Sequence, residues 1–161
     1  MRHPIVKQIK DLLDQNVLWY RYFEHKPVKT SEEAAEIRPD YTLEQGAKAL
    51  ILRVKKNKEV FFTMIVIPGN TKFDKKKVQK SLEIKNFRFA TQEEINKITE
   101  GVQIGGIPPF GNLFGIKVYA DEKILNVEKI IFNAGDRGIS IAMRSVDYKN
   151  LVKPIISQLV E

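Results

Sequence analysis

The sequence contains no cysteine and only two histidines among its 161 residues. Without cysteine there can be no disulfide, thiol nucleophile or thiolate metal ligand. His3 and His25 are too far apart to form a helical pair of metal ligands, and His25 is expected to be structural. The phosphate-binding loop ending in Gly-Lys-Ser/Thr and the nucleophile elbow are missing as well. We therefore expect no metal and no cofactor.

Long hydrophobic runs are also missing. No uninterrupted apolar stretch approaches the roughly 20 residues that a membrane helix needs. The N-terminus leads into an amphipathic pattern rather than the apolar block of a signal peptide. We expect a cytoplasmic protein with no membrane partner. With 43% hydrophobic and 29% charged residues, the composition is typical of one ordinary globular domain spanning residues 1–161.

Positive charge is concentrated in one quarter of the chain. The net charge is +7, whereas the segment from Lys48 to Arg88 carries a balance of +9 and the remainder carries −2. Such a segment is typical of a surface that docks a polyanion, although a lysine-rich solvated face would have the same composition. If the polyanion is a nucleic acid, the candidate contacts are Lys55, Lys56, Lys75, Lys76 and Lys77.

Hydrophobic periodicity and capping motifs predict a mixed α+β chain. Helices or helical turns are predicted at residues 4–16, 30–38, 42–46, 74–82 and 91–98, and from Ser145, expected as a cap, onward. Strands are predicted at residues 18–23, 48–55, 59–67, 87–90, 116–120, 129–132 and 138–144. Strands occur both in adjacent pairs and alternating with helices, which predicts a mixed, mostly antiparallel sheet or a partial barrel surrounded by helices.

The segment 104–111 combines three glycines and two prolines with almost no charge. It cannot be an α-helix or the middle of a sheet, yet Ile104, Ile107 and Phe110 make it unlike a solvated linker. Its fixed backbone N–H groups could hold a carbonyl or phosphate oxygen. The alternative is a tight corner that packs on the core.

Lys48 follows Gly46 and Ala47 and enters one of the most apolar runs in the chain. A lysine at the start of a buried strand either extends its ammonium to solvent or points it into a pocket. In a pocket, its charge would be available to a partner. The residue pattern alone leaves both alternatives open.

Four motifs in order resemble those of the YbaK-like aminoacyl-tRNA deacylases, a family that includes the editing domain of bacterial prolyl-tRNA synthetases. The segment 105–111 resembles the family's glycine-x-x-x-proline loop, with Gly105 and Pro109 at the two fixed positions. The segment 47–50 resembles the sequence around the family's essential lysine, which places that role on Lys48. This chain differs in carrying Ala49 where many relatives have asparagine or threonine.

The other two motifs lie at either end of the resemblance, which covers about residues 20–152. Residues 30–35 resemble the family's threonine-started helix, and residues 131–138 resemble an alanine-glycine turn that lines the pocket. The resemblance implies the YbaK-like fold and hydrolysis of the ester between an amino acid and the terminal adenosine of a mischarged tRNA. The partners would be that tRNA and, as an alternative, an aminoacyl-tRNA synthetase.

The resemblance and the local chemistry together nominate site residues. The catalytic group comprises Lys48, Gly105, Gly106, Ile107 and Pro109. The substrate-binding group comprises Thr30, Pro108, Phe110, Gly111, Ala134, Gly135 and Asp136. Within these groups, the N–H groups of Gly106 and Ile107 are expected to position the ester carbonyl.

Apolar walls for size selection are expected from Ile107, Phe110 and the turn at residues 134–135. Three hypotheses stay open at this point. The protein is a trans-acting deacylase, a non-catalytic tRNA-binding module of the same fold, or a regulatory protein that recognises a synthetase or a small amino-acid analogue.

Overall fold

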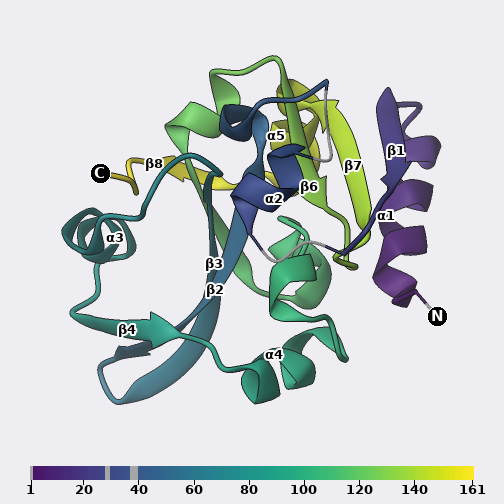
Figure 1. Ribbon diagram of the computed structural model, residues 1–161. Coiled ribbons are helices and arrows are strands. Elements are labelled where there is room, and N and C mark those ends of the chain that lie inside the picture. Colours follow the sequence, from purple (N-terminus) through teal and green to yellow (C-terminus); the bar gives the residue numbers. More distant parts are fainter. Residues whose placement is uncertain (1, 28–29, 37–39) are drawn as a thin grey trace.

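The computed structural model describes residues 2–27, 30–36 and 40–161. This part of the chain forms two β-sheets with helices packed around them (Figure 1). The α-helices are α1 (Pro4–Gln15), α2 (Ser31–Glu36), α3 (Lys75–Leu82), α4 (Gln92–Thr99) and α5 (Ser145–Val152). Short 3₁₀ turns are η1 (Leu43–Gln45), η2 (Ile104–Gly106), η3 (Gly111–Phe114) and η4 (Glu122–Leu125). The expected α+β class is confirmed.

The smaller sheet has the order β1-β7-β6 and is antiparallel throughout. Its strands are β1 (Tyr20–Glu24), β6 (Lys129–Asn133) and β7 (Ile139–Arg144). Helix α1 lies along this sheet in Figure 1 and buries Ile5, Val6, Ile9 and Leu13. Pro4 occupies the first turn of α1, where no backbone N–H is needed, and the ring of His3 accepts a hydrogen bond from the N–H of Ile5.

The larger sheet has the order β4-β2-β3-β5-β8 and is mixed. Its strands are β4 (Asn86–Phe89), β2 (Ala47–Lys56), β3 (Glu59–Pro68), β5 (Lys117–Asp121) and β8 (Ile155–Ser157). The pairs β4–β2 and β2–β3 are antiparallel, whereas β3–β5 and β5–β8 are parallel. The predicted hairpin of residues 48–55 and 59–67 is the β2–β3 pair.

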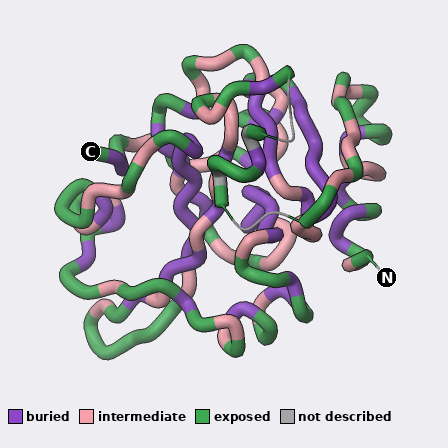
Figure 2. The backbone as a smooth tube through the Cα atoms, in the orientation of Figure 1, coloured by how far each residue is buried: buried purple, intermediate pink, exposed green. Residues whose placement is uncertain are grey.

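Both faces of the β2–β3 hairpin are covered near its start, as its continuous apolar runs predict. Ala49 and Ile51 belong to the main hydrophobic core, which also contains the buried face of α1. Leu52 and Val54 belong to a second cluster, beneath α3. The far end of the hairpin, residues 57–61, is exposed (Figure 2).

The two sheets meet at the start of β2. A parallel bridge joins Gly46 to Ile131 of β6, and the backbone N–H of Gly69 donates to the carbonyl of Gly46. In the described part of the chain the two sheets adjoin without wrapping into a closed barrel, so the mixed-sheet form of the prediction is the one observed. No helix in the described ranges has the length and apolar content to cross a bilayer.

Three local features differ from the predictions or refine them. Ser145 is not a cap: Arg144 holds the cap position, while the Ser145 hydroxyl donates to the carbonyl of Val127. The strand β8 was not predicted, because it has three residues and directly follows Pro154. The glycine-proline segment contains the short 3₁₀ turn η2 and ends at Gly111, where a second such turn, η3, begins.

Candidate active site

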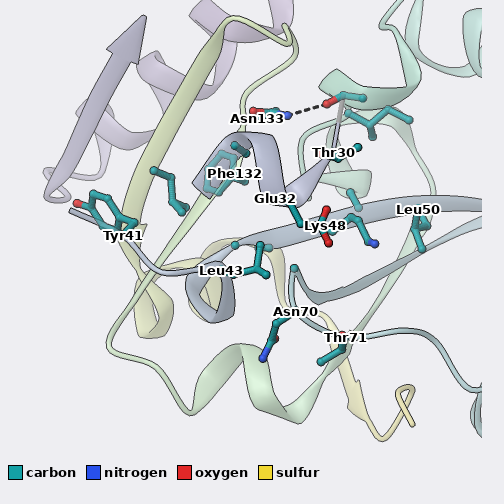
Figure 3. Close-up of a pocket in the computed structure, with 18 of the residues that line it drawn as sticks. Thr30, Glu32, Tyr41, Leu43, Lys48, Leu50, Asn70, Thr71, Phe132 and Asn133 are labelled. Carbon is teal, nitrogen blue, oxygen red and sulfur yellow. Dashed lines mark hydrogen bonds between the residues drawn. The ribbon is translucent and has the colours of Figure 1, made fainter. Parts of the chain in front are cut away.

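A cavity of about 440 Å³ opens where the two sheets meet (Figure 3). Helix α2, the start of β2, the turn after β3, the glycine-proline segment and the end of β6 all contribute to its wall. Its lining residues are Thr30, Glu32, Ala34, Tyr41, Thr42, Leu43, Gly46, Ala47, Lys48, Ala49, Leu50, Gly69, Asn70, Thr71, Lys72, Ile104, Gly105, Ile107, Ile131, Phe132 and Asn133. Segments that are distant in sequence thus line one cavity.

Lys48 lines this cavity together with Gly105 and Ile107. The pairing of β2 with β3 places Lys48 opposite Ile67, between the buried residues Ala47 and Ala49. Within the described ranges, the half-buried Lys48 side chain has no ion pair and no hydrogen bond. The pocket-facing alternative for Lys48 is therefore the one that the structure supports, and its ammonium charge is available to a ligand.

The backbone of η2 presents N–H donors, but not the pair expected from the sequence. The Gly106 N–H donates to the carbonyl of Gln103 at 2.8 Å, which closes the 3₁₀ turn. The expectation that Gly106 positions a substrate carbonyl through this group is therefore wrong. The N–H groups of Gly105 and Ile107 have no hydrogen-bond partner among the residues that the structure describes. Because both residues line the cavity, these two amides are candidate donors to a ligand there.

The glycines of η2 lie in close packing. A Cβ on Gly105 would lie 2.8 Å from Nε of Arg137, and one on Gly106 would lie 3.2 Å from the backbone of Asp136. The Gly106 carbonyl also accepts a hydrogen bond from the N–H of Gly135 at 2.8 Å. The glycine-proline segment is thus packed directly against the turn between β6 and β7.

A chain of side-chain hydrogen bonds fixes the Gly105 carbonyl. Nδ2 of Asn133 donates to that carbonyl at 2.7 Å (Figure 3), and the Ser140 hydroxyl lies 3.3 Å from Oδ1 of Asn133. Nε2 of His25 lies 2.6 Å from the same hydroxyl. The expected structural role of His25 agrees with this geometry, because the ring bonds Ser140 and lies outside the cavity wall.

The second half of the glycine-proline segment packs into the core. The Phe110 ring is fully buried, with its centroid 5.4 Å from that of Phe132 and 5.6 Å from that of Tyr148. The Tyr148 hydroxyl donates to the carbonyl of Pro109 at 2.6 Å, and burial strongly raises the pKa of this hydroxyl, so it remains a donor. The expectation that Phe110 forms a cavity wall is wrong, and Pro108 and Gly111 are likewise buried outside the lining.

The turn at residues 134–136 supports the site without lining it. Ala134 is fully buried, and Gly135 has φ +108°, where a Cβ would lie 2.1 Å from Cγ2 of Ile5 in α1. Oδ1 of Asp136 accepts a hydrogen bond from the backbone N–H of Gly138 at 2.7 Å. These three residues lie outside the cavity wall, because the turn packs toward α1, and their contact with substrate stays a prediction.

Thr30 lies in the cavity wall and its hydroxyl accepts a hydrogen bond from the Glu33 N–H at 3.1 Å, as the predicted capping motif requires. The sequence interpretation missed several polar members of the wall: Glu32, Tyr41, Thr42, Asn70, Thr71, Lys72 and Asn133. Asn133 belongs to the motif at residues 131–138, which was the available signal for it. For Glu32 the sequence offered no signal beyond its place in the first turn of a helix.

The candidate tRNA-binding lysines lie outside the cavity wall. Lys55 and Lys56 belong to the end of β2, and Lys75 and Lys76 are exposed in the first turn of α3. The Lys77 ammonium donates to the carbonyl of Val160 at 2.7 Å and so ties α3 to the segment that follows β8. Among the residues that the structure describes, no cluster of His, Cys, Asp or Glu could hold a metal ion.

The fold has counterparts among solved structures. The crystal structure of a candidate trans-editing enzyme for prolyl tRNA synthetase superposes with a TM-score of 0.82 at 22% identity, covering 100% of this chain and 99% of the other. At this level of identity, the likeness shows the fold. The arrangement of two adjoining sheets is thus shared with that structure.

The sequence comparisons identify the family. A family model for the aminoacyl-tRNA editing domain matches residues 25–151, so the chain belongs to the aminoacyl-tRNA editing domain family. The multifunctional Ser/Thr-tRNA deacylase ProXp-y of Escherichia coli (strain K12) is 29% identical over 144 residues, which are 89% of this chain and 85% of that protein. The proline–tRNA ligase of Burkholderia multivorans is 28% identical over 117 residues, 72% of this chain and 20% of the ligase.

Proposed function

We propose that this protein is a trans-acting aminoacyl-tRNA deacylase that hydrolyses the ester of a mischarged tRNA to free amino acid and tRNA. The observation that carries the proposal is the shared cavity. The ammonium of Lys48 and the N–H groups of Gly105 and Ile107, all without a partner among the described residues, line it together. Membership in the editing domain family supports the same reaction.

The reaction needs little from the protein because an aminoacyl ester is already activated. The oxygen of water attacks the ester carbonyl carbon, whose own oxygen becomes negative, and the ribose oxygen leaves and takes up a proton. In our proposal the N–H groups of Gly105 and Ile107 stabilise the negative oxygen, and each such donor is worth roughly 3 kcal/mol. Lys48 orients the substrate or binds the terminal nucleotide through its charge.

The polar part of the wall suggests the class of amino acid. The residues Thr30, Thr42 and Thr71, with hydroxyl groups, and Asn70, with an amide group, line the cavity. A site that can hydrogen-bond a substrate hydroxyl discriminates strongly against analogues that lack it. We therefore propose seryl and threonyl esters as the preferred substrates, in agreement with the activity for which the E. coli relative is named.

Lys48→Met tests the reaction and its site. This substitution removes the charge and keeps most of the side-chain volume, so we expect kcat/KM on mischarged tRNA to fall by about a hundredfold or more. The assay measures release of amino acid from a panel of seryl-, threonyl-, alanyl- and cysteinyl-tRNA esters. Thermal unfolding of the variant should match that of the unsubstituted protein.

Lys117→Met is the matched control, because Lys117 is an exposed lysine on β5 and lies outside the cavity wall. Its deacylase activity should be unchanged. Full activity of Lys48→Met would remove Lys48 from the mechanism. Binding of charged and uncharged tRNA with equal affinity, without hydrolysis of any ester, would favour the non-catalytic tRNA-binding alternative instead.

A further inference from the structure

The charged side chains that line the cavity include more positive than negative groups. Among the described residues that line it, Glu32 is the one carboxylate, and Lys48 and Lys72 supply ammonium groups. Figure 3 shows Glu32 on α2 with its carboxylate directed toward the strand that carries Lys48. The pocket therefore offers one negative group beside its positive groups.

Glu32 is not committed to another partner. Its carboxylate makes no ion pair and no hydrogen bond in the described part of the chain, and its distance from the Lys48 ammonium exceeds that of an ion pair. The first turn of α2 is held instead by Thr30, which accepts the Glu33 N–H. The Glu32 side chain is thus free to bind a ligand that enters the cavity.

The substrate of the proposed reaction has a charge pattern that matches this set. An aminoacyl ester carries an α-ammonium group on the carbon next to the scissile carbonyl, and the nucleotide carries a phosphate. Hydrogen bonds between two ionised groups are stronger than those between neutral groups. They form only where the two charged groups lie within hydrogen-bond distance of each other. Lys48 and Lys72 suit the phosphate, and the N–H groups of Gly105 and Ile107 suit the developing negative oxygen. The α-ammonium is left for a carboxylate.

We propose that Glu32 binds the α-ammonium group of the aminoacyl ester, an inference that rests on the proposed deacylase function. The ester must then have a free, protonated amine. An ester whose amine is acylated, as in peptidyl-tRNA, lacks the charge that Glu32 recognises. The carboxylate would therefore restrict the enzyme to aminoacyl-tRNA and protect tRNAs that carry a peptide.

The test compares two esters on two proteins. One substrate is seryl-tRNA, and the other is the matching ester in which a hydroxyl group replaces the α-ammonium. The unsubstituted protein should hydrolyse seryl-tRNA with a kcat/KM about tenfold to a hundredfold above that for the hydroxyl analogue. Glu32→Gln should lower kcat/KM for seryl-tRNA by a similar factor and leave that for the analogue nearly unchanged.

Glu36→Gln is the matched control, because Glu36 lies one turn further along α2, is exposed and is outside the cavity wall. It should leave the ratio of the two substrates unchanged. Equal losses on both substrates in Glu32→Gln would overturn the proposal and mark Glu32 as a proton acceptor for the water. No loss on either substrate would also overturn it.

The control for the underlying function is the unsubstituted protein itself. If it hydrolyses neither ester, the proposed deacylase function fails, and the assignment of Glu32 falls with it. If it hydrolyses both esters at the same rate, the deacylase function stands and only the assignment of Glu32 fails.

Discussion

The Asn133 side chain connects the cavity to the body of the smaller sheet. Its amide nitrogen holds the Gly105 carbonyl, and its amide oxygen lies within hydrogen-bond distance of Ser140. A peptide carbonyl held by a hydrogen bond fixes the plane of its own peptide group. Asn133 therefore orients the Gly105–Gly106 peptide, which directly precedes the amide of Ile107. We regard it as a positioning residue.

Asn133→Asp should remove the hydrogen bond that orients this peptide, while the new side chain keeps the shape of asparagine. The carboxylate cannot donate to the Gly105 carbonyl, so kcat should fall by about tenfold while KM changes little. Steady-state kinetics on a mischarged tRNA measure the two constants separately. Asn96→Asp, at an exposed asparagine outside the cavity wall, should change neither. An unchanged kcat in Asn133→Asp would show that the Gly105 carbonyl needs no such anchor.

Elements with local signals could be predicted from the sequence. The capping boxes at Thr42/Gln45 and Thr91/Glu94 are present, and Asp74 caps α3 through the Lys77 N–H, because each motif acts within one helical turn. The strand β8 could not be predicted in this way. Its three residues pair in parallel with β5, about 36 positions away, and no local pattern records such a contact.

The candidate site was predictable in part for the same reason. Lys48 and Gly105 lie in motifs that the sequence displays, and the structure places both in one cavity. Phe110 was misassigned because an apolar residue beside a loop can line a pocket or fill the core, and only the neighbours decide. Here the neighbours are Phe132 and Tyr148. Glu32 was missed because an acidic residue in a first helical turn has a sufficient local explanation.

The start of α4 links the helix to β4 through one carboxylate. Glu94 accepts hydrogen bonds from Arg88 at 2.7 and 3.0 Å and from the Thr91 N–H at 2.9 Å. The Arg88 guanidinium is the main cause that lowers the pKa of Glu94 to about 2. A carboxyl whose pKa is lower in the folded state stabilises the fold above its ordinary pKa, and this contribution disappears as the pH falls toward 2.

Glu94→Gln should remove that pH-dependent contribution. At neutral pH we expect Tm to fall by roughly 1–3 °C, because the pair is partly solvent-exposed. The difference between the two proteins should shrink between pH 4.5 and 2 as the carboxylate becomes protonated. Thermal unfolding followed by circular dichroism across this range measures it. Glu93→Gln, in the same turn, should be neutral, and a Glu94→Gln difference independent of pH would contradict the linkage.

At the scale of the whole molecule, positive charge gathers on one side. The hairpin end with Lys55 and Lys56 and the helix α3 lie on the side of the molecule away from α1 (Figure 1). The exposed tube at the hairpin end in Figure 2 shows that this region is open to solvent. We propose that the acceptor stem of tRNA lies along this side while its terminal adenosine enters the cavity. Such binding depends on salt because it releases counterions.

Charge reversal at Lys75 and Lys76 should weaken tRNA binding. We expect the slope of log affinity against log salt concentration to decrease by up to about 0.9 for each phosphate that these lysines no longer neutralise. Titrations at several salt concentrations measure the slope. Lys149→Glu with Lys153→Glu changes the net charge equally at exposed residues near α5 and should have a smaller effect. Equal effects of the two double variants would leave Lys75 and Lys76 as solubilising surface.

The hydrogen bond from the Tyr148 hydroxyl to the Pro109 carbonyl has a consequence for biosynthesis. A nascent chain that has emerged from the ribosome only as far as β7 already contains Lys48 and the glycine-proline segment. It still lacks the tyrosine that anchors that segment, as well as residues 159–161, which bond the backbone of Lys72 and Asp74. The hydrogen bonds that hold the glycine-proline segment and the turn at Lys72 can therefore be complete only after α5 and the residues beyond β8 have been synthesised.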